Sequence, residues 1–280
     1  MITRIHHVAI AVRSIETALH FYQTSLGLAV GQRAEVADQG VQAVLLPLEE
    51  GEIELLEPTD PTGGVARFLE RRGEGPHHLC LETPDVSAAM AQAKAAGLPL
   101  IDQTPRPGLA GLIGFLHPKA CHGLLVELAQ PQGKPDPPES QPGGIQAVGV
   151  DPVYLAAKDA DAAAASLTRI LGASPAPPHD DARLEARQVR LRVGQGRIVV
   201  LSPLHPGGPS DLARVLADRG EGLYGVGLRV RDFRGALQHL QDLGTPLEVR
   251  GADTPAPLAH LPPGRTHGVN LFLSPLTMAE

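Results

Sequence analysis

The stretch HHVAIAV at residues 6–12 is repeated as HHLCLET at residues 77–83, and IELLEP at residues 53–58 is repeated as VELAQP at residues 126–131. In each copy a histidine pair opens an apolar run of strand length, and a glutamate lies within a later run. Similarity at a fixed period is the sequence signature of a repeated structural unit. We therefore predict two copies of one unit within these residues.

Four polar residues recur at the spacing of the two copies. His78 follows His7 by 71 residues, and Glu127 follows Glu54 by 73 residues. A carboxylate inside an apolar strand is costly to bury without a cation or another partner. Two imidazoles and two carboxylates form a nitrogen and oxygen ligand set that suits cobalt, manganese, nickel, iron or zinc. If the copies pack as a pseudo-twofold pair, the four side chains converge on a metal site.

A second layer of repetition divides the chain into halves. FLERRGEGPHHLCLETPD at residues 68–85 resembles VLADRGEGLYGVGLRVRD at residues 215–232, a shift of 147. AVRSIETALHFYQTSLG at residues 11–27 matches AAKDADAAAASLTRILG at residues 156–172, a shift of 145. The chain is therefore predicted to be a tandem of two halves, each built from two units.

Between the halves lies PQGKPDPPESQPGG, residues 131–144, whose prolines and glycines oppose regular structure. We interpret it as an interdomain linker. The predicted division is a metal-binding domain at residues 1–130, a linker at 131–145 and a second domain at 146–280.

Hydrophobic periodicity and turn residues predict a βαβββ order in each unit. In the first unit, Ser14 is the expected N-cap of a helix that ends at Gly27. The remaining elements expected in the first half are strands at 5–12, 28–33, 41–47 and 52–57, a connecting helix at 65–72, then a strand at 78–82, a helix at 86–96 and strands near Leu98, at 113–116 and at 124–128.

Composition excludes several classes of partner. The formal net charge is −7 and aromatic residues make up 3% of the chain, which argues against nucleic acid or an anionic membrane surface. No apolar run approaches bilayer length and no signal peptide is expected, so a cytoplasmic location is predicted. Cys80 and Cys121 have no metal-binding spacing, and we interpret both as structural thiols.

Paired βαβββ units with histidine and glutamate ligands resemble the vicinal oxygen chelate superfamily. Within it, IHHVAIAV, EIELLEPTDP, VARFLERRGEGPHHL and FLHPKACHGLLVELAQ are similar to the methylmalonyl-CoA epimerase family across residues 3–130. The resemblance implies an α+β fold of tandem vicinal oxygen chelate domains, with four βαβββ modules in paired curved mixed sheets.

The same resemblance implies a function. It predicts epimerisation of (R)- and (S)-methylmalonyl-CoA, an acyl-CoA substrate, at one divalent metal ion, with cobalt expected and manganese, nickel or zinc as alternatives. Matched position by position, the metal ligands are His7, Glu54, His78 and Glu127, and Glu127 is also the catalytic base. Coordination of the substrate would make its α-proton acidic by stabilising the enolate.

The partner of Glu127 in proton transfer is left open. Inversion needs two acid/base groups, or one mobile group with exchange. Some members of the family carry a second carboxylate in the strand where this chain has Ala43. His117 or Lys119 of the FLHPK segment, or a metal-bound water, are the alternatives.

The second half is expected to keep the fold and to lack the metal. The same alignment replaces His7 by Pro152, Glu54 by Val199, His78 by Gly225 and Glu127 by Phe272. Because members of the family associate as homodimers, this degenerate copy is predicted to replace the second subunit, in a monomer or a dimer of the whole chain.

Two other functions remain open. A glyoxalase I-type isomerase of a glutathione hemithioacetal would use the same four ligands, although HPKACHGLLVEL is closer to the epimerases. A non-catalytic small-molecule-binding protein on this scaffold would not need an intact ligand set. An extradiol dioxygenase is disfavoured because a site of two histidines and one carboxylate would not need Glu54.

Overall fold

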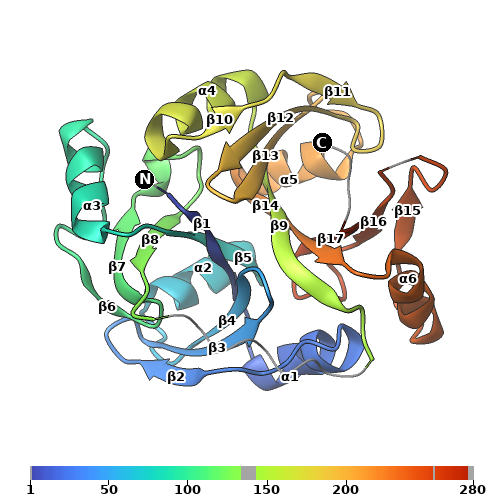
Figure 1. The fold of residues 1–280 in the computed structure, drawn as a ribbon, viewed down its shortest axis with the longest axis horizontal. Coiled ribbons are helices and arrows are strands. Elements are labelled where there is room, and N and C mark those ends of the chain that lie inside the picture. Colours follow the sequence, from blue (N-terminus) through green and yellow to red (C-terminus); the bar gives the residue numbers. More distant parts are fainter. Residues whose placement is uncertain (1, 134–142, 255, 277–280) are drawn as a thin grey trace. The chain divides into compact units, whose positions relative to one another are not determined.

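A computed structural model describes residues 2–133, 143–254 and 256–276 (Figure 1). The predicted linker therefore lies largely outside the described residues. The elements of the first half are β1 (Arg4–Ala11), α1 (Ile15–Leu19), η1 (His20–Ser25), β2 (Arg33–Val36), β3 (Val41–Pro47), β4 (Glu52–Pro58), α2 (Gly64–Arg72), β5 (Gly75–Glu82), α3 (Val86–Ala95), β6 (Arg106–Gly108), β7 (Gly111–Leu116), η2 (Pro118–Ala120) and β8 (Val126–Gln130).

The second half repeats this order of elements. Its elements are β9 (Ala147–Ala156), α4 (Ala160–Leu171), β10 (Ser174–Pro175), β11 (His179–Asp181), β12 (Ala186–Val193), β13 (Gly196–Pro203), α5 (Asp211–Arg219), β14 (Gly222–Val230), α6 (Phe233–Asp242), β15 (Glu248–Arg250), β16 (Leu258–Leu261) and β17 (Asn270–Pro275).

The strands form two mixed sheets that curve strongly in Figure 1. The first has the order β2-β3-β4-β1-β5-β8-β7-β6, and the second has the order β10-β12-β13-β9-β14-β17-β16-β15 with β11 beside β12. In every module the first and last strands are parallel, whereas the others pair antiparallel. The predicted α+β class with repeated βαβββ modules is confirmed.

Each module uses the same local signal to start its helix. Ser14 Oγ accepts the backbone N–H of Thr17, as the sequence predicts, and Asp85, Asp159 and Asp232 cap α3, α4 and α6 in the same way. Helix α1 continues into the π-helix η1, and Gly27 ends it at a φ of 72°. Serine and aspartate caps at equivalent positions are further evidence of the duplication.

Two expected strands were wrong. The strand predicted at 28–33 begins only at Arg33, because Gly31 N–H and the Gln32 carbonyl both bond to Leu45 and delay the regular ladder. Near Leu98 the structure has an isolated bridge between Leu100 and Leu116 in place of the expected strand. Both errors fall where backbone pairing with a distant strand decides the conformation.

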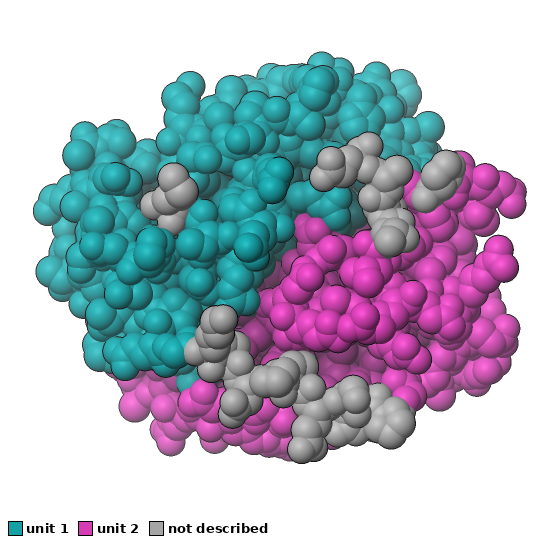
Figure 2. Space-filling view, viewed as in Figure 1, with its two compact units in different colours: residues 1–6, 78–134, 152–224 teal, residues 7–77, 135–151, 225–280 magenta. Residues whose placement is uncertain are grey.

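The chain divides into two compact units (Figure 2). Unit 1 contains residues 1–6, 78–134 and 152–224, and unit 2 contains residues 7–77, 135–151 and 225–280. Each unit thus combines segments from both halves of the sequence. In unit 2, for example, the buried Tyr22 of the first half donates its hydroxyl hydrogen to the Thr266 carbonyl of the second half at 3.1 Å.

Candidate functional site

Strands β1 and β4 bring the first histidine and glutamate together. They pair in parallel with Ala9 opposite Glu54, which puts His7, two residues before Ala9, on the same face as the carboxylate. His7 Nε2 lies 3.4 Å from Glu54 Oε2. Both residues are buried, at 2% and 5% exposure.

Strands β5 and β8 make the equivalent pair in the second module. Cys80 lies opposite Glu127, and His78 Nε2 lies 3.1 Å from Glu127 Oε2. The His78 ring also meets Phe115 edge to face, at 5.3 Å between centroids. An aromatic edge contact and a carboxylate contact together hold this imidazole in one orientation.

The donor atoms fit a divalent metal ion. In unit 2 a buried imidazole nitrogen of His7 lies beside a carboxylate oxygen of Glu54, and in unit 1 His78 and Glu127 form the same kind of pair. Buried carboxylates beside imidazoles favour a bound cation over an empty apolar pocket. The four residues therefore remain the proposed ligand set. Cys80 lies opposite Glu127 in the β5–β8 ladder, so its side chain is on the same face of the sheet as His78 and Glu127.

The position of Ala43 supplies no second base. Ala43 is buried at 1% exposure and lies opposite Leu56 in the β3–β4 ladder, so it offers no acid to the site. His117 is half-buried, and its Nδ1 accepts the backbone N–H of Lys119 at 3.1 Å. A neutral His117 therefore carries its proton on Nε2.

The register of the second sheet identifies what replaces the ligands. Val199 lies opposite Tyr154, and Phe272 lies opposite Gly227. These pairs reproduce the first-half pairs Ala9 with Glu54 and Cys80 with Glu127, which puts Pro152 and Gly225 at the two histidine positions. All four equivalent positions therefore carry residues without a metal-ligating side chain.

Phe272 takes the space of a lost ligand. A Cβ atom at Gly225 would lie 2.8 Å from the Phe272 ring, and that ring stacks on His260 at 4.8 Å between centroids. His260 Nε2 in turn lies 2.9 Å from Asn270 Oδ1. An aromatic stack thus fills the place where His78 and Glu127 meet in the first half.

Two motifs with no role assigned from the sequence join the halves. Glu74 of the first RGEG segment accepts the backbone N–H of Arg13 at 2.7 Å and contacts His267 Nδ1 at 2.9 Å. Glu221 of the second RGEG segment accepts the backbone N–H of Lys158 at 2.9 Å and contacts His122 Nδ1 at 3.5 Å. The HG dipeptides at 122–123 and 267–268, one from each half, were the signal that could have revealed this exchange.

An acidic turn also contacts the second half. Glu49 and Glu50 pair with Arg231 and Arg229, and Glu50 N–H bonds to the Val148 carbonyl at 2.9 Å. From the sequence alone, a pair of glutamates at this position is typical of a solvated turn. The contacts with the arginines could not be predicted, because these partners lie about 180 residues away.

No helix among the described residues is long and apolar enough to cross a membrane. Both cysteines are buried and neither forms a disulfide. Burial raises the pKa of the Cys121 thiol to about 12, which agrees with its interpretation as a structural thiol.

Both halves of the chain match one family model. The model described as Glyoxalase/Bleomycin resistance protein/Dioxygenase superfamily matches residues 6–116 and 151–257. An ethylmalonyl-CoA/methylmalonyl-CoA epimerase of Cereibacter sphaeroides is 41% identical over 133 residues, which cover 46% of this chain and 99% of that protein. The mitochondrial methylmalonyl-CoA epimerase of Homo sapiens is 36% identical over 129 residues, 45% of this chain and 73% of that protein.

One solved structure spans both halves. A mutant of 4-hydroxymandelate synthase from Streptomyces coelicolor matches 98% of this chain and 92% of its own, with a TM-score of 0.75 and 16% sequence identity. The likeness establishes the tandem fold, and at this identity it carries no information about the reaction.

Proposed function

The chain belongs to the glyoxalase/bleomycin resistance protein/dioxygenase superfamily, and on that premise we propose that its first half is a metal-dependent epimerase of methylmalonyl-CoA. The observation that carries the proposal is the pair of buried histidine–glutamate contacts, His7 with Glu54 and His78 with Glu127. Support comes from relatives of the first half that are themselves named methylmalonyl-CoA epimerases.

The residues of the site have different roles in the proposed reaction. A divalent ion held by His7, Glu54, His78 and Glu127, for which we propose cobalt, would supply the positive charge that stabilises the substrate enolate. Glu127 accepts the α-proton. The contact with His78 Nε2 fixes Oε2 of Glu127, so the carboxylate is oriented before the substrate arrives.

Burial of the site supports carbanion chemistry. Glu54 and Glu127 are each 5% exposed, so little water competes for the proton held by the base. A base that keeps its proton can return it to the same carbon. Exchange of the α-proton with solvent and inversion at the α-carbon therefore have to be measured separately.

Inversion requires a proton donor for the opposite face of the enolate. Ala43 has no acid/base side chain, so we propose His117 as the candidate donor, because its Nδ1 is taken by the Lys119 amide and its Nε2 is left to donate. Lys119 of the same segment is exposed and is the alternative donor.

The second half replaces the second subunit in this proposal. The reciprocal contacts of Glu74 with His267 and of Glu221 with His122 support an arrangement like that of a twofold dimer. We propose one active site per chain, in a cytoplasmic protein that is a monomer or a dimer, with the domain boundaries at residues 1–130 and 146–280.

The direct test follows proton exchange. Cobalt-loaded full-length protein is incubated with (R)-methylmalonyl-CoA in D2O, and NMR records both deuterium incorporation and epimer composition. We expect exchange with epimerisation in the wild type and in Glu70→Gln, an exposed carboxylate variant on α2. Glu127→Gln should lower both rates by about a hundredfold or more.

Other outcomes separate the alternatives. Exchange without inversion would mean that His117 does not act as the second group. No exchange by metal-loaded protein would overturn the proposal, and turnover of a glutathione hemithioacetal by the same sample would assign a glyoxalase I-type isomerase.

A further inference from the structure

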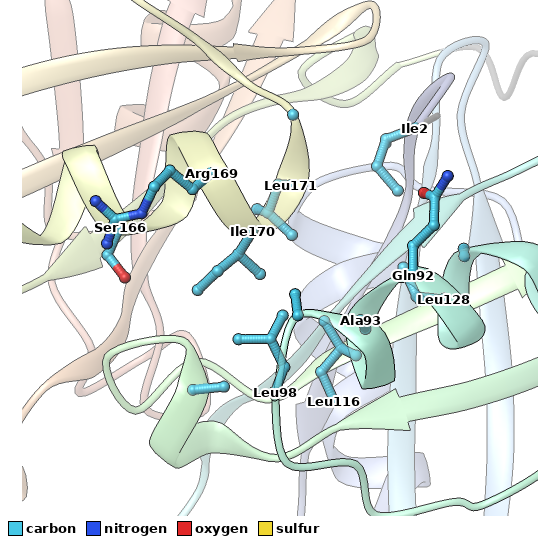
Figure 3. A pocket seen from close by; sticks show the side chains of 14 residues that line it. Ile2, Gln92, Ala93, Leu98, Leu116, Leu128, Ser166, Arg169, Ile170 and Leu171 are labelled. Atoms are coloured by element: carbon cyan, nitrogen blue, oxygen red, sulfur yellow. The ribbon is translucent and has the colours of Figure 1, made fainter.

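Helices α3 and α4 of unit 1 border a cavity of about 600 Å³ (Figure 3). Its lining is mixed, with an apolar part: Leu98, Leu116 and Leu128 lie on one side, and Ile170 and Leu171 of α4 point toward them in Figure 3. A volume of this size is in the range of small-molecule sites. The cavity thus offers an apolar binding space at a contact between the two sequence halves.

The cavity lies on the sheet face opposite the proposed metal ligands. Successive residues of a strand point to opposite faces, so Leu128 and Glu127 of β8 face different sides. Leu116 lies opposite Val126 in the β7–β8 ladder, on the same face as Leu128. A molecule in this cavity is therefore distinct from a substrate at Glu127.

The equivalent contact in unit 2 explains why space is left here. The repeat shifts of 145 and 147 relate α1/η1 to α4 and α3 to α6. In unit 2, Phe21 and Leu240 are buried, and His239 Nε2 donates to the Ser25 carbonyl at 2.9 Å. In unit 1 the corresponding residues are Ser166 for Phe21, Ala93 for Leu240 and Gln92 for His239.

At two positions a smaller residue lines the cavity where a larger one is buried in unit 2. Ser166 replaces Phe21, and Ala93 replaces Leu240. The cavity is open to solvent along α3, where Gln92 and Ala96 are exposed. The sequence thus encodes the difference between the equivalent helix pairs at Ala93 and Ser166.

The polar side chains that line the cavity, Gln92, Ser166 and Arg169, can each donate a hydrogen bond, and Arg169 is the charged one. Arg169 and Ser166 are three residues apart on α4 and therefore lie on one face of that helix. Arg169 is exposed and forms no ion pair within the described part of the chain. At the C-terminal ends of α3 and α4, backbone hydrogen bonds run from Leu98 N–H to the Ala93 carbonyl and from Ala173 N–H to the Thr168 carbonyl. These backbone groups therefore already have partners within the chain.

We propose that this cavity binds an unbranched medium-chain carboxylate, with the alkyl chain against the leucines and the carboxylate at Arg169 and Ser166. The apolar walls match a methylene chain, and the donor edge matches one anionic head group. A chain of roughly eight to twelve carbons suits a cavity of this class.

The test titrates full-length protein with octanoate, decanoate and dodecanoate below their micelle concentrations. Calorimetry gives the affinity, and methyl NMR gives the location. We expect affinity to rise roughly threefold to fourfold per methylene, with shifts at Leu98, Leu116, Leu128 and Ile170 methyl groups.

Three variants locate the site. Arg169→Gln should weaken decanoate binding by roughly tenfold, whereas Lys94→Gln, which removes an exposed cation from α3, should not change it. Ala93→Leu installs the residue that unit 2 uses and should abolish binding. Ser166→Phe is the second filling variant, should Ala93→Leu fail to fold.

Binding should survive His7→Ala, which removes a proposed metal ligand, so failure of the epimerase proposal would leave this one intact. No binding by any of the three carboxylates would overturn the proposal. Equal losses in Arg169→Gln and Lys94→Gln would also overturn it, as would a filling variant that binds normally.

Discussion

Glu74 Oε2 lies 2.9 Å from His267 Nδ1, a contact between residues 193 apart in the sequence. Its counterpart joins Glu221 and His122 at 3.5 Å. Each half gives one glutamate and one histidine, and each glutamate contacts the histidine of the other half. Such exchange is the geometry of an isologous twofold interface, here between two halves of one chain.

The first prediction concerns this exchange. Glu74→Ala should lower the free energy of unfolding by about 1 kcal/mol, because it removes the contact with His267 and leaves the Arg13 amide without its acceptor. Glu221→Ala should cost less, since its histidine contact is longer. Urea denaturation measures both values.

A double-mutant cycle of Glu74→Ala with His267→Ala isolates the pair. We expect a coupling energy of roughly 0.5 kcal/mol, because both side chains are partly exposed and solvent screens them. If the two single-mutant losses of stability add exactly, the pair has no coupling energy and does not stabilise the association of the two halves.

The second prediction uses two glycines. Gly268 has a φ of 77°, and a Cβ there would lie 1.9 Å from the Glu74 carbonyl oxygen. Gly268→Ala should therefore destabilise the protein by about 3 kcal/mol or more, through backbone strain and a clash that cannot relax.

Gly172→Ala is the matched control. Gly172 has the left-handed conformation, with φ 64° and ψ 31°, but a Cβ added there would meet no atom of the described residues within 4 Å. Its cost should therefore be the backbone strain alone, about 1 kcal/mol. Thermal unfolding of the two variants compares them. Equal losses would mean that the close backbone approach at Gly268 is unimportant.

The third prediction is the metal content. Full-length protein loaded with cobalt and desalted should contain one metal ion per chain, measured by elemental analysis. His78→Ala should reduce this to well below one, while Phe272→Leu in the second half should not change it, because the equivalent positions carry no ligand. Two ions per chain would contradict the interpretation of the second half as metal-free.

The fourth prediction is a loss of stability at high pH. Burial raises the pKa of Cys121 to about 12, and burial followed by the charge of Glu74 raises the pKa of Tyr22 above its ordinary value. A group whose pKa is raised by folding contributes its full stability below the pKa of the unfolded chain, about 9 for a thiol and about 10 for a phenol.

Stability should therefore fall as the pH rises above about 9, and continue to fall toward pH 12. Chemical denaturation at a series of pH values measures the slope. Cys121→Ala should flatten the slope near pH 9 to 10. At pH 8 the native thiol should resist iodoacetamide and react only after unfolding, and rapid alkylation of native protein would argue against its burial.

The repeated modules could be predicted from the sequence alone. The spacings of 71 and 73 residues that relate His7 to His78 and Glu54 to Glu127 reveal the repeat. Helix caps such as Ser14 and alternating apolar strands are local signals, and local signals establish which segments become helices and strands. The missing ligands at Pro152, Val199, Gly225 and Phe272 were also predictable, because one alignment carries every position to its copy.

The pairings between distant segments could be seen only in the folded chain. Glu74 with His267, Glu50 with Arg229 and the cavity beside Ala93 depend on residues far apart in the chain, and many partners satisfy the same charge or size pattern. The strand expected at 28–33 was wrong for the same reason, since Leu45 on another strand sets its start. Short-range patterns indicate what a segment prefers, and long-range packing selects which neighbour it meets.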